Sequence, residues 1–543
     1  MDRVDRSGPQ NVNHHSSCHS EERSDEESAV LCRAESLVFT LSANTLIFPL
    51  FLRLSVLCGK VFCFAEDALA YIQFLGAAGT VTGSKHLINT GDASGKNGFQ
   101  VLIDCGLFQG PKEWRERNWS DTPIPAKAID AVILTHAHLD HCGWIPRLVK
   151  EGFRGPIYAT PPTIDLCGII LPDSGHLQEE DARFYNKIKK SKHDPALPLY
   201  TFDEAHEALQ YFKPVQVGET LQLSHELSFR FVRAAHILGS CMAEVSLKAD
   251  GKARRLLFTG DIGRVHDHKV APGKVVHSGP QEGESADIVV MESTYGNRRH
   301  PKEDALPELG ELISATARRG GSVIVPAFAI ERTQKFVFIL KHLIESGQIP
   351  RLPVFCDSPM AIKAVEIFLK HDEEYSDETR EMIRKYGSPL AWPGFTFAST
   401  PEESKKINEA RMPSVIISSS GMVTGGRILH HLSQRLPDPR NLVLFIGFQA
   451  PGTRGFTIKS KSDEVKIYGD FVPIRAQVAA LEQFSDHADP PELLQWLRTF
   501  GNQPATTYLV HGEPNASGQL RELMARELGW DVRVAQYREK VEV

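Results

Sequence analysis

The sequence predicts an α/β protein built from two parts, a layered αββα fold and an inserted Rossmann-like domain. The layered part is predicted by short apolar strands that each lead to a His, Asp or Glu residue. The inserted part is predicted by a region in which strands and helices alternate, which is typical of a parallel sheet with crossover helices. At 543 residues the chain is too long for one compact core, so two or three domains are expected.

The composition is that of an ordinary soluble globular protein, with 41% hydrophobic and 24% charged residues. The net charge of −7 argues against a chain whose whole surface binds nucleic acid. It leaves room for a basic groove beside metal ions, because the ions themselves supply positive charge. The nine cysteines form no CxxC pair and no regular spacing, which predicts a reduced, cytoplasmic protein without a disulfide framework.

Residues 1–69 differ in composition from the rest of the chain. The segment 14–28 is polar and charged and is expected to be disordered. The apolar segment 37–57 has the composition of a signal-peptide core or a membrane anchor, but Pro49 and Arg53 interrupt it. It also begins far from the N-terminus. We therefore expect residues 1–69 to be an extension upstream of the true start, and we expect no association with a membrane.

A cluster of metal-capable side chains follows the apolar stretch 131–134, which predicts a buried strand. His136 and His138 alternate along the chain, so both can point into one site. Asp140 and His141 lie one turn further on and can reach a second ion. Imidazole and carboxylate ligands suit Zn²⁺, with Mn²⁺ or Fe as competitors. A polar loop with chance histidines is the structural alternative, but similar residues recur at the ends of other strands.

Other predicted strands also lead to polar side chains. Strands at 71–75 and 85–88 precede a strand at 99–103, which ends at Asp104. This carboxylate could cap a turn or accept a hydrogen bond from a metal-bound histidine. Three later strands lead to candidate residues: 227–235 to His236, 255–259 to Asp261, and 287–291 to Glu292. One such residue is more often structural, but three in succession predict a site along one edge of a sheet.

From residue 301 the pattern of the chain changes. The predicted strands are 322–325, 353–355, 414–417 and 442–446, and the predicted helices include 330–343 and 358–369. This alternation predicts the Rossmann-like domain. It contains no GxGxxG motif, so no nucleotide cofactor is expected.

The loop 418–427 of this domain joins a strand to a helix. Its hydroxyl groups, glycines and N–H groups could form an anion cradle, or they could belong to an ordinary loop. The guanidinium groups of Arg427 and Arg332 could add contacts to a phosphate, although Arg332 could also be a solvated helix residue. The candidate phosphate- or RNA-binding residues are Ser419, Ser420, Gly421, Met422, Arg427 and Arg332.

The last part of the chain returns to the pattern of the first. Asp489 and Pro490 predict the start of a helix directly after His487. The stretch 507–510 predicts a strand that ends at His511. Either histidine alone would more often be structural than functional.

Taken in order, these residues resemble the motifs of a known family. Asp104, the His136-x-His138-x-Asp140-His141 motif, His236 and Asp261 resemble the metal motifs of the metallo-β-lactamase superfamily. Glu292, His487 and His511 resemble the three additional motifs of its β-CASP branch of RNA- and DNA-processing nucleases. The resemblance covers residues 70–543. It implies a metallo-β-lactamase domain in two segments, 70–298 and 468–543, which are separated by a β-CASP domain at 299–467.

The resemblance also implies two Zn²⁺ ions per chain, with Mn²⁺ or another divalent metal as an alternative. It assigns one ion to His136, His138 and His236, the second to Asp140, His141 and His511, and makes Asp261 a bridge between them. Asp104 would support a metal-bound histidine from behind. Glu292 and His487 would form an acid/base pair near the scissile phosphate, with Asp140 as a further catalytic residue.

The function implied by the resemblance is a zinc-dependent ribonuclease. It would hydrolyse phosphodiester bonds of single-stranded RNA by a two-metal hydroxide mechanism, in RNA processing or degradation. Endonuclease and 5′-exonuclease modes, RNA and DNA substrates, and a monomer and a homodimer all remain open. A small-molecule hydrolase of the lactamase or thioesterase type is disfavoured by Glu292, His487 and the inserted domain. A non-catalytic RNA-binding scaffold is disfavoured because every proposed ligand is present.

Overall fold

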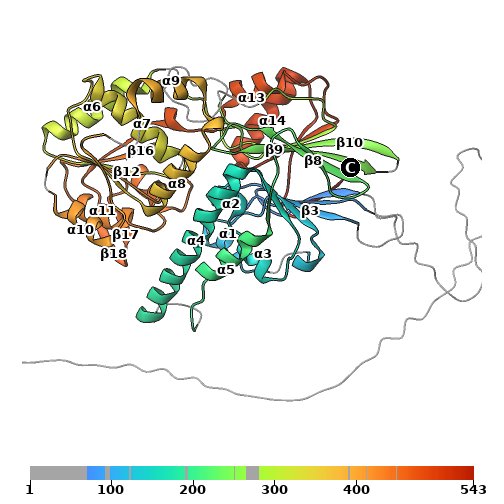
Figure 1. Ribbon diagram of the computed structural model, residues 1–543, viewed down its shortest axis with the longest axis horizontal. Coiled ribbons are helices and arrows are strands. Elements are labelled where there is room, and N and C mark those ends of the chain that lie inside the picture. Colours follow the sequence, from blue (N-terminus) through green and yellow to red (C-terminus); the bar gives the residue numbers. More distant parts are fainter. Residues whose placement is uncertain are drawn as a thin grey trace, which may run out of the picture. The chain divides into compact units, whose positions relative to one another are not determined.

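The computed structural model describes residues 70–91, 98–120, 124–189, 194–249, 251–264, 281–301, 303–388, 392–410, 412–447 and 449–543. The expected N-terminal extension, with its apolar segment, lies outside these residues. The described chain forms two seven-stranded sheets, one six-stranded sheet and a two-stranded hairpin (Figure 1). The predicted α/β class is therefore confirmed. None of the described helices combines the length and the apolar composition that a membrane span requires.

The first sheet has the strand order β22-β1-β2-β3-β4-β5-β6. Its strands are β1 Tyr71–Phe74, β2 His86–Asn89, β3 Gln100–Ile103, β4 Ala131–Ile133, β5 Ile157–Ala159, β6 Phe212–Pro214 and β22 Lys540–Glu542. Strands β3, β4 and β5 are parallel. The loops that follow β3 and β4 consequently leave the sheet at the same edge.

The second sheet has the strand order β21-β20-β11-β10-β9-β8-β7. Its strands are β7 Thr220–Gln222, β8 Leu227–Arg233, β9 Cys241–Ala249, β10 Lys252–Phe258, β11 Ile288–Glu292, β20 Thr506–Val510 and β21 Val532–Val534. Strands β10, β11 and β20 are parallel, and β8 runs in the same direction because β8 and β10 both pair antiparallel with β9. The four strands that precede candidate residues in this sheet therefore end at one edge.

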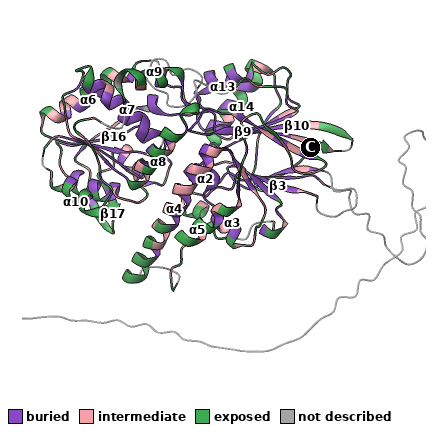
Figure 2. Ribbon diagram, viewed as in Figure 1, coloured by how far each residue is buried: buried purple, intermediate pink, exposed green. Residues whose placement is uncertain are grey.

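The two seven-stranded sheets pack face to face through an apolar core, to which Ile103 and Ile133 contribute from the first sheet and Phe231 and Phe258 from the second. Burial of each phenylalanine stabilises the fold by roughly 1.5–3 kcal/mol. Helices cover both outer faces, and the ribbon in Figure 2 is coloured by how far each of their residues is buried. This is the predicted αββα arrangement.

The helices of this layered part come from two segments of the chain, one before and one after the parallel-sheet part. Those over the first sheet are α3 Ile145–Lys150, α4 Pro161–Ile188 and α5 Phe202–Ala208, and those over the second are α13 Pro490–Leu497 and α14 Pro514–Leu528. Shorter helices are α1 Lys112–Glu116, α2 Leu139–Cys142, and the 3₁₀ turns η1 Ala126–Ala128 and η2 Leu209–Tyr211. The 28-residue helix α4 was not predicted from the sequence. It contains Pro172, a residue that usually argues against a helix interior.

The third sheet is parallel throughout and has the order β14-β13-β15-β12-β16-β19. Its strands are β12 Val323–Pro326, β13 Val354–Asp357, β14 Phe395–Phe397, β15 Val415–Ser418, β16 Leu442–Phe445 and β19 Gln477–Ala480. A hairpin of β17 Glu464–Ile467 and β18 Asp470–Pro473 precedes the last strand. The predicted Rossmann-like arrangement is thus confirmed, and its sheet extends to Ala480.

Helices lie on both faces of this third sheet. Helices α6 Ala305–Arg318 and α7 Arg332–Glu345 pack on one face, and α11 Ile428–Arg435 and α12 Arg454–Lys459 on the other. The remaining helical segments are α8 Pro359–Lys370, α9 Asp377–Tyr386, α10 Pro401–Glu409, η3 Asp372–Glu374 and η4 Glu482–Phe484. Helix α7 begins two residues later than predicted, because Glu331 has a φ of 64° and cannot continue a right-handed helix.

Candidate metal centre

The seven side chains that the sequence singles out as metal ligands meet where β4, β8, β10 and β20 end. They form two groups within which the ligand atoms lie no more than 4.8 Å apart: His136, His138, His236 and Asp261 in one, and Asp140, His141 and His511 in the other. The ligands come together because of strand direction: the strands that precede them, in both sheets, end at the same edge of the fold. Five of these side chains are buried, and His138 and Asp140 are half-buried, so water has limited access to compete with an ion.

The first group has the spacing of a metal site. His136 Nε2 lies 3.1 Å from His138 Nδ1 and 3.6 Å from Asp261 Oδ2. His236 Nε2 lies 3.5 Å from the same carboxylate oxygen. Ligand atoms at about 2.0–2.1 Å from a tetrahedral Zn²⁺ are separated from each other by roughly 3.3 Å. The separations of these three pairs are therefore close to those expected around an ion of this size.

The second group shares Asp261 with the first. His141 Nε2 lies 3.3 Å from Asp261 Oδ1 and 3.2 Å from His511 Nε2. Asp140 Oδ2 lies 3.4 Å from His511 Nε2. Asp261 consequently presents one oxygen to each group, which is the arrangement expected of a carboxylate between two ions.

Buried polar atoms without partners give an independent test of whether metal fits here. Both ring nitrogens of His236 are buried and make no hydrogen bond among the described residues. An unsatisfied buried polar group costs about 1–3 kcal/mol. A divalent cation bound by His236 Nε2 and Asp261 would relieve much of this cost, so the donor set fits divalent metal binding.

The protonation of the site also suits a metal. Burial lowers the pKa of His136 and His236 well below the usual value and that of His138 to about 4, so these imidazoles are neutral. Burial also disfavours the charged form of His141, but Asp261 and Asp104 raise its pKa well above the usual value. Neutral imidazole is the form that binds a cation, and a bound ion would displace the proton of His141.

Asp104 supports the ligand His141 from behind. Its Oδ2 atom lies 2.7 Å from His141 Nδ1, and its two oxygens accept hydrogen bonds from the Thr135 backbone N–H at 2.8 Å and from the Thr135 hydroxyl at 2.9 Å. These contacts direct His141 Nε2 towards the other ligands. Such carboxylate–histidine contacts fix the ring orientation and make the imidazole a better ligand.

We expect Asp104→Ala to weaken metal affinity by roughly 10–100-fold, the usual cost of removing a partner of a metal-bound histidine. The measurement is a competition titration against a chelator of known affinity. Asp130→Ala is the matched control, because its carboxylate accepts a hydrogen bond from the Gln100 N–H in the same sheet without being one of the clustered candidate ligands. Equal affinity in the Asp104 variant and the wild type would contradict this role.

A histidine–carboxylate pair lies beside the metal cluster. Glu292, the last residue of β11, is buried, and its two oxygens lie 3.2 and 3.1 Å from His487 Nδ1. The His487 ring centroid is 4.6 Å from that of His236. Burial disfavours the charged form of His487, but the Glu292 carboxylate raises its pKa to about 8. The pair can hold a proton next to the cluster at neutral pH.

The loop 418–427 approaches the cluster through Phe328. A Cβ atom on Gly421 would lie 2.7 Å from the Phe328 ring, so this close contact requires glycine. The Phe328 ring centroid lies 6.2 Å from that of His138. Ser419, Ser420 and Met422 flank Gly421 in this loop and are partly exposed. Their contact with phosphate stays a prediction.

The two predicted phosphate-binding arginines already have carboxylate partners. Arg427 Nη1 donates to Asp357 Oδ1 at 2.8 Å, and Arg332 Nε donates to Asp486 Oδ2 at 2.7 Å. Neither aspartate, nor Phe328, was expected at the site from the sequence. Asp486 directly precedes His487 in the sequence, which is a local signal that could have been weighed. Phe328 carries no comparable signal, because its approach to His138 depends on tertiary packing.

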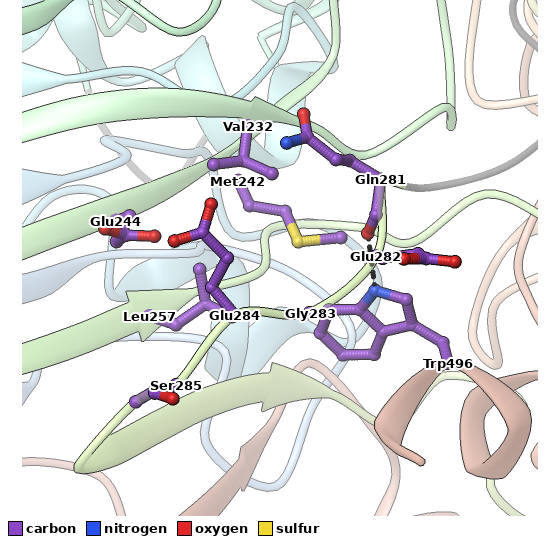
Figure 3. A pocket seen from close by; sticks show the side chains of 11 residues that line it. Val232, Met242, Glu244, Leu257, Gln281, Glu282, Gly283, Glu284, Ser285 and Trp496 are labelled. Atoms are coloured by element: carbon purple, nitrogen blue, oxygen red, sulfur yellow. Dashed lines mark hydrogen bonds between the residues drawn. The ribbon is translucent and has the colours of Figure 1, made fainter. Parts of the chain in front are cut away.

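A recess lined by residues outside this cluster is shown in Figure 3. Val232, Met242 and Trp496 contribute apolar walls, and Glu244 and Glu284 lie at its rim. The two glutamates are paired with arginines, as Arg230 and Arg255 each contact both. Every group of three or more potential metal ligands among the described residues belongs to the cluster around Asp261.

Comparison with known proteins identifies three matching family models. They are the metallo-beta-lactamase superfamily at residues 95–293, the Beta-Casp domain at 333–458, and the Zn-dependent metallo-hydrolase RNA specificity domain at 472–535. The chain is 37% identical over 469 residues to "Ribonuclease TTHA0252" of Thermus thermophilus, covering 86% of this chain and 99% of the relative.

Two archaeal relatives are also similar, both from Methanocaldococcus jannaschii. "Transcription termination factor FttA" is 31% identical over 451 residues, covering 81% of this chain and 67% of the relative. An "RNase J-like protein" is 30% identical over 421 residues, covering 76% and 87%.

Proposed function

Since the chain belongs to the Beta-Casp branch of the metallo-β-lactamase superfamily, we propose that it is a zinc-dependent ribonuclease acting on single-stranded RNA. The observation that carries the proposal is the two-part ligand cluster with the His487–Glu292 pair beside it. The match to a relative named ribonuclease over 99% of its length supports RNA as the substrate. The match to an RNA specificity domain at residues 472–535 is consistent with that substrate.

The proposal includes two Zn²⁺ ions, with Mn²⁺ as an alternative. The ligands would be His136, His138 and His236 for the first ion, Asp140, His141 and His511 for the second, and Asp261 for both. When bound, such ions lower the pKa of a water molecule towards neutrality and offset charge on the phosphate. The proposed division of the chain is a metallo-β-lactamase part at 70–298 and 468–543 and a β-CASP part at 299–467. Strand β19, from the second metallo-β-lactamase segment, adds to the edge of the parallel sheet of the β-CASP part.

The proton for the leaving oxygen would come from His487. Because Nδ1 faces Glu292, Nε2 is the ring nitrogen that can donate to the substrate. The Glu292 carboxylate holds the ring in this orientation and stabilises its protonated form. A general acid of this kind contributes typically about 10²–10⁴-fold to the rate.

The preference for a single strand is supported by Phe328. Its ring is half-buried beside His138 and can stack on an unpaired base, which a duplex would not offer. The rival function, a small-molecule hydrolase on the same metal fold, leaves the His487–Glu292 pair and the β-CASP part without a role.

The test is cleavage of labelled single-stranded RNA by chelator-stripped protein and by the same protein after Zn²⁺ or Mn²⁺ is restored. We expect cleavage only with metal, and weaker cleavage of the same sequence as a duplex. Substrates that differ only in their 5′ end, followed by product mapping, separate endonuclease from 5′-exonuclease action. Full activity of the stripped protein, or turnover of a chromogenic lactam without RNA cleavage, would refute the proposal.

A further inference from the structure

Asp486, the residue before His487, lies between two cations of helix α7. Arg332 Nε donates to Asp486 Oδ2 at 2.7 Å, and Lys335 Nζ donates to Asp486 Oδ1 at 3.2 Å. The side chains of Arg332, Lys335 and Asp486 are only 8%, 2% and 5% exposed. The two cations are three residues apart on the first turn of α7, so they lie on the same face of the helix.

Burying three ionisable groups to connect two parts of a protein costs free energy. Each group must lose its hydration, and a well-packed apolar contact would usually serve stability equally well. Burial raises the pKa of Asp486, but Lys335 and Arg332 hold it below its usual range, so the carboxylate stays ionised. A contact that buries a carboxylate between two basic side chains points to a geometric requirement.

The geometry that Asp486 controls is that of the adjacent peptide. The backbone of His487 pairs with Gly263, the Ala488 N–H donates to the Ile262 carbonyl at 2.9 Å, and His300 Nε2 lies 2.8 Å from the His487 carbonyl. These contacts attach the peptide to the layered part of the fold. The Asp486 side chain attaches it to helix α7 of the parallel-sheet part.

Arg332 also has partners other than Asp486, which hold its guanidinium group in place. Its Nη1 atom donates to the Ile446 carbonyl at 2.8 Å, and its guanidinium lies 5.9 Å from the Phe328 ring centroid. The start of α7 therefore contacts the His487 peptide through Asp486, and its Arg332 also lies near Phe328, whose ring is close to His138. Docking of this helix fixes both sides of the reaction site at once.

We propose that Asp486 is a positioning residue, which holds the proton-donating His487 against the metal centre when helix α7 is docked. In this role Arg332 and Lys335 act through Asp486. This is a different role for Arg332 from the phosphate contact considered from the sequence. This inference rests on the proposed function, because it takes His487 as the general acid.

The test compares two substrates with one variant, Asp486→Asn. RNA has an alkoxide leaving group that needs a proton, whereas bis(p-nitrophenyl) phosphate releases a stable phenolate that does not. We expect kcat on RNA to fall by roughly 10–100-fold, as for a misplaced catalytic group. We expect kcat on the nitrophenyl ester to stay within about twofold of the wild type and the metal content to be unchanged.

Two further variants control for folding and for charge. Glu244→Gln alters a carboxylate that also lies between two cations, Arg230 and Arg255, at the recess of Figure 3, and it should leave both substrates unaffected. Asp486→Asn with Lys335→Met removes one charge of each sign, so it relieves the uncompensated buried charge of the single variant. We expect the double variant to fold and to show the same RNA-selective loss.

The outcomes separate this inference from the function on which it rests. An equal loss on both substrates, or a loss of bound metal, would make Asp486 merely structural and overturn the inference. The inference would also be overturned if Asp486→Asn reduced RNA cleavage further in a His487→Ala background, because residues that act as a unit are not additive. A wild-type protein that hydrolyses the ester but never RNA would instead refute the proposed function.

Discussion

Asp261→Ala is expected to reduce RNA cleavage by at least about a thousandfold, which corresponds to the several kcal/mol that metal ions contribute to stabilising charge in the transition state. Asp261 Oδ2 lies 3.6 and 3.5 Å from His136 and His236 Nε2, and its Oδ1 lies 3.3 Å from His141 Nε2. Its removal therefore takes one ligand from each group. It also leaves imidazoles facing one another without a negative charge between them.

Elemental analysis of dialysed protein and single-turnover cleavage of single-stranded RNA measure the two expected losses separately. Asp287→Ala is a suitable control, because this carboxylate accepts a hydrogen bond from the Arg255 N–H just before β11 begins, while Glu292 at the other end of that strand faces the metal centre. The control should keep both metal and activity. Wild-type metal content together with wild-type activity in Asp261→Ala would contradict the shared role of this carboxylate.

The ligand strands could be predicted because the signals are local. His236, Asp261 and His511 each follow an apolar stretch, and the stretch predicted at 255–259 corresponds to β10 at Lys252–Phe258. A strand that is apolar and followed by a metal-capable side chain reveals both its burial and its function. The directions of β8, β10, β11 and β20 then bring the residues to one edge.

Side-chain partners across long separations could not be predicted in this way. The sequence suggested that Arg332 could bind phosphate, but its structural partner Asp486 is 154 residues away. Arg427 and Asp357 are separated by 70 residues. An arginine in a loop or at the start of a helix has the same local context whether it meets a substrate phosphate or a carboxylate of its own chain. Only the packing of α7 and β13 distinguishes the two.

His487→Ala is expected to lower RNA cleavage by roughly 10²–10⁴-fold, the usual contribution of a general acid. Metal content should stay at the wild-type value, because His487 belongs to none of the ligand groups even though its ring lies close to that of His236. The nitrophenyl ester should be hydrolysed at nearly the wild-type rate, since its leaving group needs no proton. A loss of metal in this variant would show that His487 supports the cluster and is not the acid.

Glu292→Gln tests the same assignment through pH. Burial lowers the pKa of His487, but the Glu292 carboxylate raises it to about 8, so the amide variant should have a lower pKa. An acid must carry its proton, so activity on RNA falls as pH rises through this pKa, and that alkaline limb should move to lower pH in Glu292→Gln. Bound cations lower the pKa in both proteins, which leaves the sign of the difference unchanged.

The pH profile of kcat/KM on RNA, measured for wild type and Glu292→Gln, would reveal the shift, and the nitrophenyl ester profile should lack it. The two proteins should differ most between their two pKa values, where the wild type keeps its proton and the variant has lost it. Below both values the acid is protonated in each protein, so the difference that remains there reports the ring orientation that Glu292 imposes on His487. An alkaline limb that stays in place, or moves to higher pH, would show that Glu292 does not raise the pKa of the general acid.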